Sequence, residues 1–282
     1  MALDGEMEMQ MTDEISSDIE QYYDAMAEQE LDRLDVQRTE HAVTWRFLRT
    51  HLPTPPARIA DIGGGPGRYA LVLAADGYAV TLVDLSARVL ELAKERALTT
   101  GVSIMQYTHA NALDLSMLKS DAFDAVLLLG PLYHLLSEDD RKRALIEARR
   151  LLRPGGLIFA AFITRYAPLR DAARHRPLAL VEEREWVQTI LDTGQHHSPG
   201  TGRFTDAYFA HPSEIAPLMK SSGFTTLDLI ACEGIVSGID EQVNVLEGDG
   251  WEAWVELNYQ LGRDPSIHGA AEHLLCVGRK DM

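Results

Sequence analysis

The stretch RIADIGGGPGRY, residues 58–69, restricts the fold of this chain more than any other. Ile59 and Ile62 favour a buried strand, and the three consecutive glycines after them allow positive φ angles and a close approach of the backbone to a ligand. Pro66 suits the first position of a helix, because its missing N–H would have no partner there. A helix that starts behind such a turn offers free N–H groups and a partial positive charge. The stretch therefore predicts a strand, a turn and a helix that bind the polar part of a nucleotide-like ligand.

Two ligand classes are compatible with this turn. Residues 65–70 fit the loose dinucleotide pattern G-x-G-x-x-(G/A), and Asp84 lies 19 residues after Gly65, where a ribose-binding acid is expected. Asp61, directly before the glycines, favours a second interpretation. Residues 61–67, DIGGGPG, resemble the first motif of the class I S-adenosylmethionine methyltransferases. In that family the acid and the glycines contact the methionine part of the cofactor.

The composition is that of an ordinary globular protein. With 282 residues, 46% of them apolar and 24% charged, the chain is long enough for one elaborated domain or two small ones. No apolar run approaches the ~18 residues of a membrane span, and the acidic N-terminus is neither a signal nor a transit peptide. Cys232 and Cys276 lie in apolar, strand-like runs, which indicates reduced core residues. We therefore expect a cytoplasmic protein with no membrane partner.

The net charge of −17 is concentrated at the start of the chain. Before Arg33 there are eleven Asp and Glu residues and no Lys or Arg, which is typical of a solvated acidic segment. An acidic protein without a basic groove is a poor phosphate binder. We therefore expect no nucleic acid partner, and the charge favours a small-molecule acceptor.

From residue 57 onward, apolar strands alternate with helices. Strands are expected at 58–62, 79–83, 104–108, 123–129 and 157–163, and later at 224–232 and 273–277. We expect three serine-capped helices, after Ser86, Ser137 and Ser213, and two further helices, at 180–191 and 251–261. This order predicts a mostly parallel sheet that is covered on both faces and binds ligands beyond the carboxyl ends of its strands.

The chain divides into five expected parts. Residues 1–13 form a disordered acidic tail, and residues 14–56 form a helical cap with an apolar face. That face contains Leu31, Leu34, Val43, Phe47 and Leu48. Residues 57–163 form the cofactor-binding core, and 164–211 form a lid or substrate insertion. Residues 212–282 complete the core and contain a helical insertion at 233–271.

Four further stretches strengthen the resemblance to class I methyltransferases. Val83-Asp84 resembles the second motif, whose acid binds both ribose hydroxyls, and residues 110–115 resemble the third, in which Asn111 replaces the usual Asp. Residues 123–130 resemble the fourth motif strand, and residues 150–156 resemble the usual turn into strand five. The family implies a Rossmann-like, seven-stranded, mostly parallel α/β sheet with an antiparallel last strand and helices on both faces.

The resemblance implies S-adenosylmethionine as the cofactor and S-adenosylhomocysteine as the product. The residues it assigns to the cofactor follow the first four strands. They are Asp61, Gly63, Gly64, Gly65, Gly67, Asp84, Leu85, Asn111, Ala112, Leu129 and Gly130.

His134 is the candidate general base, because it follows the fourth strand near the expected methyl donor. The pairing of His134 with Tyr22 or Tyr23 resembles the phosphoethanolamine methyltransferases, in which a tyrosine of an N-terminal helix and a histidine after strand four close over the site. A histidine satisfied inside the fold is the structural alternative. Candidate substrate residues lie after the fourth and fifth strands: Tyr133, Arg165, Tyr166, Arg203, Tyr208 and His211.

Residues 130–133, GPLY, partly resemble the N/D-P-P-Y/F motif of nucleobase amino-methyltransferases, but Gly130 lacks the side chain that binds the target amino group. We therefore expect a methyltransferase that acts on an O or N atom of a small molecule. Two alternatives remain: a catalytically silent binding protein with the same fold, and an NAD-dependent oxidoreductase. No metal is expected, because His196, His197 and His211 match no ligand spacing.

Overall fold

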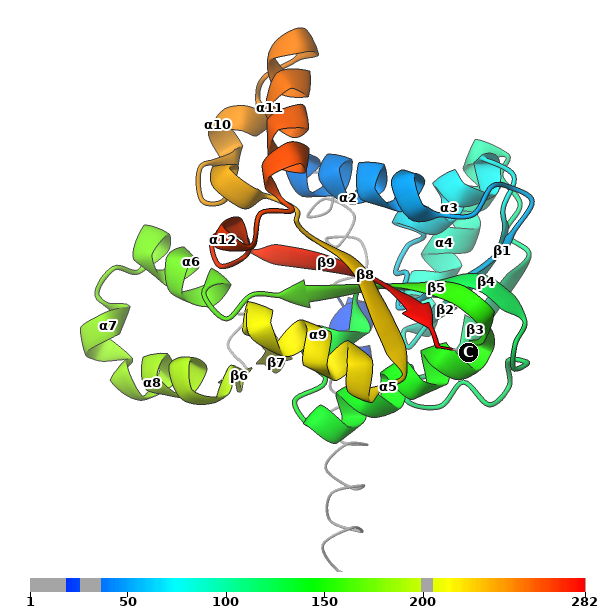
Figure 1. Cartoon of the computed structure of the whole chain (residues 1–282), viewed down its shortest axis with the longest axis horizontal. Helices are drawn as coiled ribbons and strands as arrows, with labels where there is room; N and C mark the ends of the chain where they lie inside the picture. Colours follow the sequence, from blue (N-terminus) through cyan, green and yellow to red (C-terminus); the bar gives the residue numbers. More distant parts are fainter. Residues whose placement is uncertain (1–18, 26–36, 199–204, 282) are drawn as a thin grey trace, which may run out of the picture.

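A computed structural model of the chain describes residues 19–25, 37–198 and 205–281 (Figure 1). Its centre is a seven-stranded sheet with the strand order β3-β2-β1-β4-β5-β9-β8. The strands are β1 (Arg58–Ile62), β2 (Ala79–Asp84), β3 (Gln106–His109), β4 (Phe123–Leu128), β5 (Leu152–Ile163), β8 (Phe224–Ala231) and β9 (His273–Lys280). The pairs among β1 to β5 are parallel, whereas β9 runs antiparallel to both β5 and β8. The expected sheet, with its antiparallel last strand, is confirmed.

Successive residues of the central strands face two separate apolar cores, as the pleat of a strand requires. In β4, Ala125 and Leu127 belong to one core, while Val126 and Leu128 belong to the other. Helices α2 (Arg38–His51), α3 (Arg68–Ala75), α4 (Ala87–Thr100) and α11 (Gly248–Leu261) cover the first core. Helices α5 (Glu138–Leu151) and α9 (Pro212–Ser221) cover the second. Strands that are apolar on both faces therefore fold into the middle of three layers.

Two insertions extend from this sheet, as Figure 1 shows. The first follows β5 and consists of α6 (Ala167–His175), α7 (Ala179–Glu182), α8 (Arg184–Thr193), β6 (Gln195–His196) and β7 (Ala207–Tyr208). The second follows β8 and consists of η2 (Gly234–Val236), α10 (Asp240–Asn244), α11 and α12 (Pro265–His268). A short 3-10 helix, η1 (Pro131–His134), follows β4.

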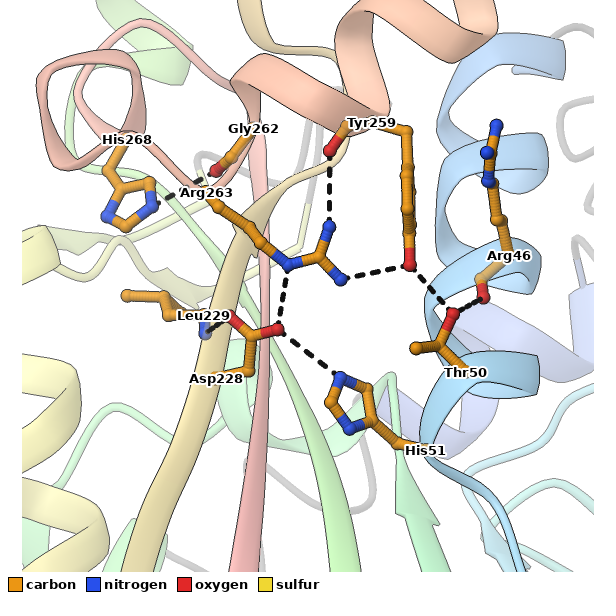
Figure 2. A network of polar contacts seen from close by, with 9 residues as sticks. All are labelled: Arg46, Thr50, His51, Asp228, Leu229, Tyr259, Gly262, Arg263 and His268. Atoms are coloured by element: carbon orange, nitrogen blue, oxygen red, sulfur yellow. Dashed lines mark hydrogen bonds and ion pairs between the residues drawn. The ribbon is translucent and has the colours of Figure 1, made fainter.

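A polar network holds α2 against the second insertion (Figure 2). The carboxylate of Asp228 on β8 lies 3.3 Å from His51 Nε2 and accepts a hydrogen bond from Arg263 Nε at 2.8 Å. Arg263 also donates to the hydroxyl of Tyr259, which lies 2.7 Å from the Thr50 hydroxyl on α2. The network fixes the orientation of α2. The first turn of this helix lies over the carboxyl ends of the strands.

The helix starts confirm two of the three expected serine caps, and they correct the third cap and the expected position of Pro66. Ser86 and Ser137 cap α4 and α5 as expected. Pro66 is not at a first helical position: Gly67, with φ +80°, is the N-cap of α3, so the proline lies in the turn before it. The cap of α9 is His211 and not Ser213, because Pro212 already occupies the first helical position.

Several other boundaries differ from the expected ones. Strand β5 begins at Leu152 instead of residue 157, and β9 ends at Lys280 instead of residue 277. The helix expected at 180–191 is divided into α7 and α8, and β3 begins at Gln106 instead of residue 104. Residues 19–25 are helical. The expected tail at 1–13 and the apolar Leu31 and Leu34 lie outside the described residues. Within the described ranges, no helix has the length and apolar character needed to cross a membrane.

Candidate functional site

The turn after β1 is shaped by contacts that leave no room for side chains. A Cβ on Gly63, where φ is +66°, would lie 2.6 Å from the Pro131 ring, and one on Gly64 would lie 2.6 Å from the Asp61 carboxyl group. A Cβ on Gly65 would meet no atom within 4 Å, although its φ of +58° still favours glycine. The backbone at Gly65 is therefore open to a ligand.

Asp84, at the end of β2, faces this turn. Its Oδ2 accepts a hydrogen bond from the N–H of Gly65 and its Oδ1 accepts one from the N–H of Ser86, both at 2.9 Å. Burial raises the pKa of Asp84, and the two N–H groups act against that shift. Each carboxylate oxygen has a further lone pair beyond these bonds. Asp84 can therefore hold two ribose hydroxyls without losing its contacts with the turn.

Asp61 lies beneath the turn and is 1% exposed. Neither of its carboxyl oxygens has a hydrogen-bond partner among the described residues. Burial, and then the nearby charge of Asp84, raise the pKa of Asp61 to about 7. A buried carboxyl group without a partner is costly in an isolated protein, so a positively charged group bound above the turn would stabilise its ionised form.

Asp84 and the glycine turn at Gly63 and Gly65 border a cavity of about 820 Å³, its open mouth included. The walls come from the ends of β1, β2, β3 and β4, from η1 and from the helical segment 19–25. The lining residues that the sequence predicted are Tyr23, Gly63, Gly65, Asp84, Leu85, Asn111, Ala112, Gly130, Tyr133 and His134. Its volume is typical of a cofactor site. Asn111 Oδ1 accepts from the N–H of Leu113 at 3.0 Å, so the amide that replaces the family's Asp also stabilises its own turn.

His134 is 5% exposed and is held by one hydroxyl on each ring nitrogen. The hydroxyl of Tyr23 lies 2.8 Å from Nε2, and the hydroxyl of Thr205 lies 3.0 Å from Nδ1. If Nδ1 carries the proton and donates to Thr205, then Nε2 accepts from Tyr23. Tyr22 contacts the edge of the Tyr23 ring, with the ring centres 5.4 Å apart, and is not one of the cavity's lining residues.

Polar contacts dock the segment 19–25 around the cavity. Asp24 Oδ1 accepts hydrogen bonds from the hydroxyl of Ser86 and, at 3.4 Å, from the N–H of Arg88 at the start of α4. Glu20 lies 3.2 Å from His109 Nε2, which also donates to the carbonyl of Leu85 at 2.7 Å. Because Ser86 also donates to Asp84, a chain of hydrogen bonds connects the N-terminal segment to the glycine turn.

The other predicted residues lie at different distances from the cavity. Gly64 and Gly67 support the turn from behind, and Leu129 lines a neighbouring cavity. Arg165 and Tyr208 bind Glu214, and the Tyr166 ring lies against His211. These four candidate substrate residues form a separate group under α9, so their substrate role stays a prediction. Arg203 lies outside the described residues.

Sequence reasoning missed Thr205, the docking role of Asp24, and the apolar wall residues Ile19, Val89 and Leu135. Thr205 lies within a long insertion that carries no motif, so no local pattern indicates it. Asp24 stands beside the two tyrosines, but an exposed acid in an acidic segment gives no signal. Within the described part of the chain, no group of His, Cys, Asp and Glu side chains could hold a metal ion.

Comparison with known proteins adds independent findings. Residues 60–160 match a family model described as a methyltransferase domain. The ubiquinone biosynthesis O-methyltransferase of Xanthomonas axonopodis pv. citri (strain 306) is 28% identical over 196 residues, 68% of this chain and 74% of that protein. The protein of the same name from Thiobacillus denitrificans (strain ATCC 25259 / T1) is 27% identical over 184 residues, 65% of this chain and 71% of that protein.

Solved structures share the fold. A SAM-dependent methyltransferase from Methanosarcina mazei superimposes with a TM-score of 0.57 at 19% identity, covering 84% of this chain and 97% of that one. The 1,6-didemethyltoxoflavin-N1-methyltransferase of Burkholderia thailandensis, solved with bound 1,6-didemethyltoxoflavin and S-adenosylhomocysteine, gives 0.55 at 17% identity, covering 97% and 90%.

Proposed function

This chain is a class I S-adenosylmethionine-dependent methyltransferase, and from that premise we propose that it methylates an O or N atom of a small molecule. The observation that carries the proposal is the position of the Tyr23–His134 pair. This pair lines the same cavity as Asp84 and the glycine turn. A methyl acceptor with an O–H or N–H group must lose a proton when it is methylated, and a pair of residues beside the cofactor site could take up that proton.

The residues around the cavity fit the cofactor. Asp84 would hold the ribose hydroxyls, the open backbone at Gly65 would accommodate the methionine part, and Asn111 with Ala112 would border the adenine. Asp61 beneath the turn would be stabilised in its charged form by a nearby positive group. When bound, S-adenosylmethionine supplies an electrophilic methyl group on a positively charged sulfonium.

Tyr23 and His134 would handle the proton. With His134 Nε2 as the acceptor, the Tyr23 oxygen retains a lone pair for a proton from the methyl acceptor, while its own proton moves to Nε2. Thr205 would keep His134 in the required tautomer through Nδ1. We also propose that residues 164–211, the insertion that supplies Thr205, act as a lid. Together with the N-terminal helices, this lid would cover the methyl acceptor.

Several properties favour a small acceptor over a macromolecule. The net charge of −17 opposes binding of nucleic acid, and Gly130 has no side chain to hold a nucleobase amino group. The named similar proteins comprise an O-methyltransferase of ubiquinone biosynthesis and a 1,6-didemethyltoxoflavin-N1-methyltransferase. Cys232 and Cys276 are buried free thiols, which suits the reducing cytoplasm as the proposed location.

The test is turnover of S-adenosylmethionine to S-adenosylhomocysteine in the presence of a metabolite extract, with the methylated product followed by mass spectrometry. We expect product formation that depends on the extract and is lost in His134→Ala. Cofactor binding without turnover across fractionated extracts would favour the silent binding protein. Tight binding of NAD would favour the oxidoreductase.

A further inference from the structure

Arg141, near the start of α5, is a buried cation that the proposed proton transfer does not use. The residue is 4% exposed, and its Nε atom has no hydrogen-bond partner in the described part of the chain. Glu138 borders the same surface cavity as Arg141 but pairs with Lys142. Glu214 borders this cavity too and pairs with Arg165. Since a buried charge is costly unless its surroundings compensate it, the groups that contact the Arg141 guanidinium indicate what it holds in place.

The first group that Arg141 binds is the backbone directly after His134. Its Nη1 donates hydrogen bonds to the carbonyl of Leu135 at 2.6 Å and to the carbonyl of Leu136 at 2.8 Å. Both residues follow η1, the short helix that ends at His134. Hydrogen bonds from a charged donor are stronger than those between neutral groups. Arg141 therefore ties the end of η1 to α5, a helix of 14 residues that packs on the sheet.

The second group that Arg141 contacts is the ring of Tyr208 on β7. The central carbon of the guanidinium lies over this ring, 3.4 Å from its centre. The Tyr208 hydroxyl donates a hydrogen bond to Glu214 on α9 at 2.5 Å, and Figure 1 shows β7 beside that helix. A cation over an aromatic face is attracted by it, and the attraction is strongest where water is excluded. Tyr208 is therefore held at its ring by α5 and at its hydroxyl by α9.

The hairpin of β6 and β7 also carries the contact with the His134 ring. Thr205, whose hydroxyl lies 3.0 Å from His134 Nδ1, stands three residues before Tyr208. Gln195 pairs with Tyr208 across the hairpin and donates to the Leu136 carbonyl at 3.3 Å. The Leu136 carbonyl is thus bound from α5 and from the hairpin at once. The α5 guanidinium therefore fixes the end of η1 relative to the chain segment that supplies Thr205.

We propose that Arg141 is a positioning residue, which holds η1 and β7 together and so keeps the Thr205 hydroxyl on His134 Nδ1. Which ring nitrogen of a histidine carries the proton is set by the hydrogen bond of the other nitrogen. With Nδ1–H held by Thr205, Nε2 stays unprotonated and can accept the proton of Tyr23. The inference rests on the proton-accepting role of His134 proposed above, and it adds a residue that does not line the cofactor cavity.

The tautomer of His134 can be measured without an acceptor and without turnover. In protein labelled with nitrogen-15 at histidine, long-range correlation spectra show which ring nitrogen carries the proton, at about pH 8 where an ordinary histidine is neutral. The His134 signals are those missing from His134→Gln. We expect one tautomer in the wild type, with the proton on Nδ1, and a mixture of both tautomers in Arg141→Met.

Two further variants keep this measurement decisive. Tyr208→Leu breaks the stack from the side of the insertion and should also give both tautomers, so it decides the question if Arg141→Met does not fold. Lys142→Met makes the same change at the next residue of α5, a cation that pairs with Glu138, and should keep the single tautomer. A single Nδ1–H tautomer in the folded Arg141→Met and Tyr208→Leu proteins would overturn the inference.

Turnover with a metabolite extract gives a second readout. Arg141→Met should lower kcat by about tenfold or more and leave the affinity for S-adenosylhomocysteine unchanged. Because Arg141 acts through Thr205, adding Arg141→Met to Thr205→Val should lower kcat by less than about a further twofold. Losses that multiply in the double variant would overturn the inference. A change of tautomer in Arg141→Met with no turnover by the wild type would instead contradict the proposed methyl transfer.

Discussion

The hydroxyl of Tyr23 and Nε2 of His134 lie 2.8 Å apart, although the two residues are separated by 111 positions in the chain. Their rings meet edge to face, with the centres 5.5 Å apart. Tyr23 comes from the segment before the sheet begins, and His134 comes from the turn after β4. The contact therefore places an N-terminal side chain at the cofactor cavity, where its oxygen can meet a bound acceptor.

His134→Ala should lower kcat by roughly 10²–10⁴-fold, the usual span for loss of a general base. The affinity for S-adenosylmethionine should stay nearly unchanged, because Asp84 and the glycine turn do not depend on the imidazole. Steady-state kinetics and calorimetry would measure the two quantities on the same preparation. A lower melting temperature with full specific activity in the folded fraction would instead show that the histidine is structural.

Tyr23→Phe and Tyr22→Phe form a matched pair of variants. Tyr23→Phe removes the hydroxyl that binds Nε2 and should reduce kcat by about tenfold or more. Tyr22→Phe removes a hydroxyl from a ring that touches only the edge of Tyr23 in the described contacts, so kcat should change less than about twofold. Equal losses in both variants would contradict the assigned role of Tyr23.

Asp24→Asn should loosen the segment 19–25 from the start of α4. The variant keeps the size of the side chain and one acceptor oxygen, but it removes the negative charge that strengthens the hydrogen bonds from Ser86 and Arg88. We expect roughly 1–2 kcal/mol weaker binding of S-adenosylhomocysteine. Protection of residues 19–25 from hydrogen exchange on cofactor binding should also be reduced. Glu91→Gln, an exposed site on α4, is the control, and identical exchange in both variants would argue against docking through Asp24.

The stability of the protein should fall between pH 6.5 and about 9. Glu233 raises the pKa of His273 from 6.5 to about 9, and Glu40 and Glu272 also face it. A raised histidine pKa contributes stability that is complete below the unfolded value and is lost as the pH rises through the folded value. His273→Gln should remove a pH-dependent difference of roughly 1–3 kcal/mol. Urea unfolding at several pH values would measure it, and parallel profiles for the two proteins would refute the assignment.

The glycine turn and the groups around it could be predicted from the sequence, because each of them is specified by residues that are neighbours in the chain. A turn that needs positive φ at Gly63, an acid at the end of β2 and a helix capped by Ser86 are each specified by neighbouring residues. The strands of the sheet could also be predicted, because a continuous apolar run gives a strand two apolar faces, and such a strand is buried in a parallel sheet.

The proposed acceptor side of the site depends on contacts between distant parts of the chain, so the sequence alone does not predict it. Tyr23 reaches His134 from the N-terminal segment and Thr205 reaches it from the insertion after β5, and nothing in the sequence around Thr205 indicates this. Arg165 and Tyr208 are candidates from the sequence because both lie in the insertion expected after the fifth strand, at residues 164–211. The structure instead joins them to Glu214, because an N3 glutamate in the capping box of α9 is the nearest partner for both.

The central claim is that Asp84 and the glycine turn bind S-adenosylmethionine. Calorimetric titration of the wild type and of Asp84→Ala is the most direct measurement. We expect the wild type to bind S-adenosylmethionine and S-adenosylhomocysteine, and the variant to lose roughly 1.5–3 kcal/mol, the range for hydrogen bonds to a charged group. Undiminished affinity in Asp84→Ala, or tight binding of NAD by the wild type, would contradict the claim.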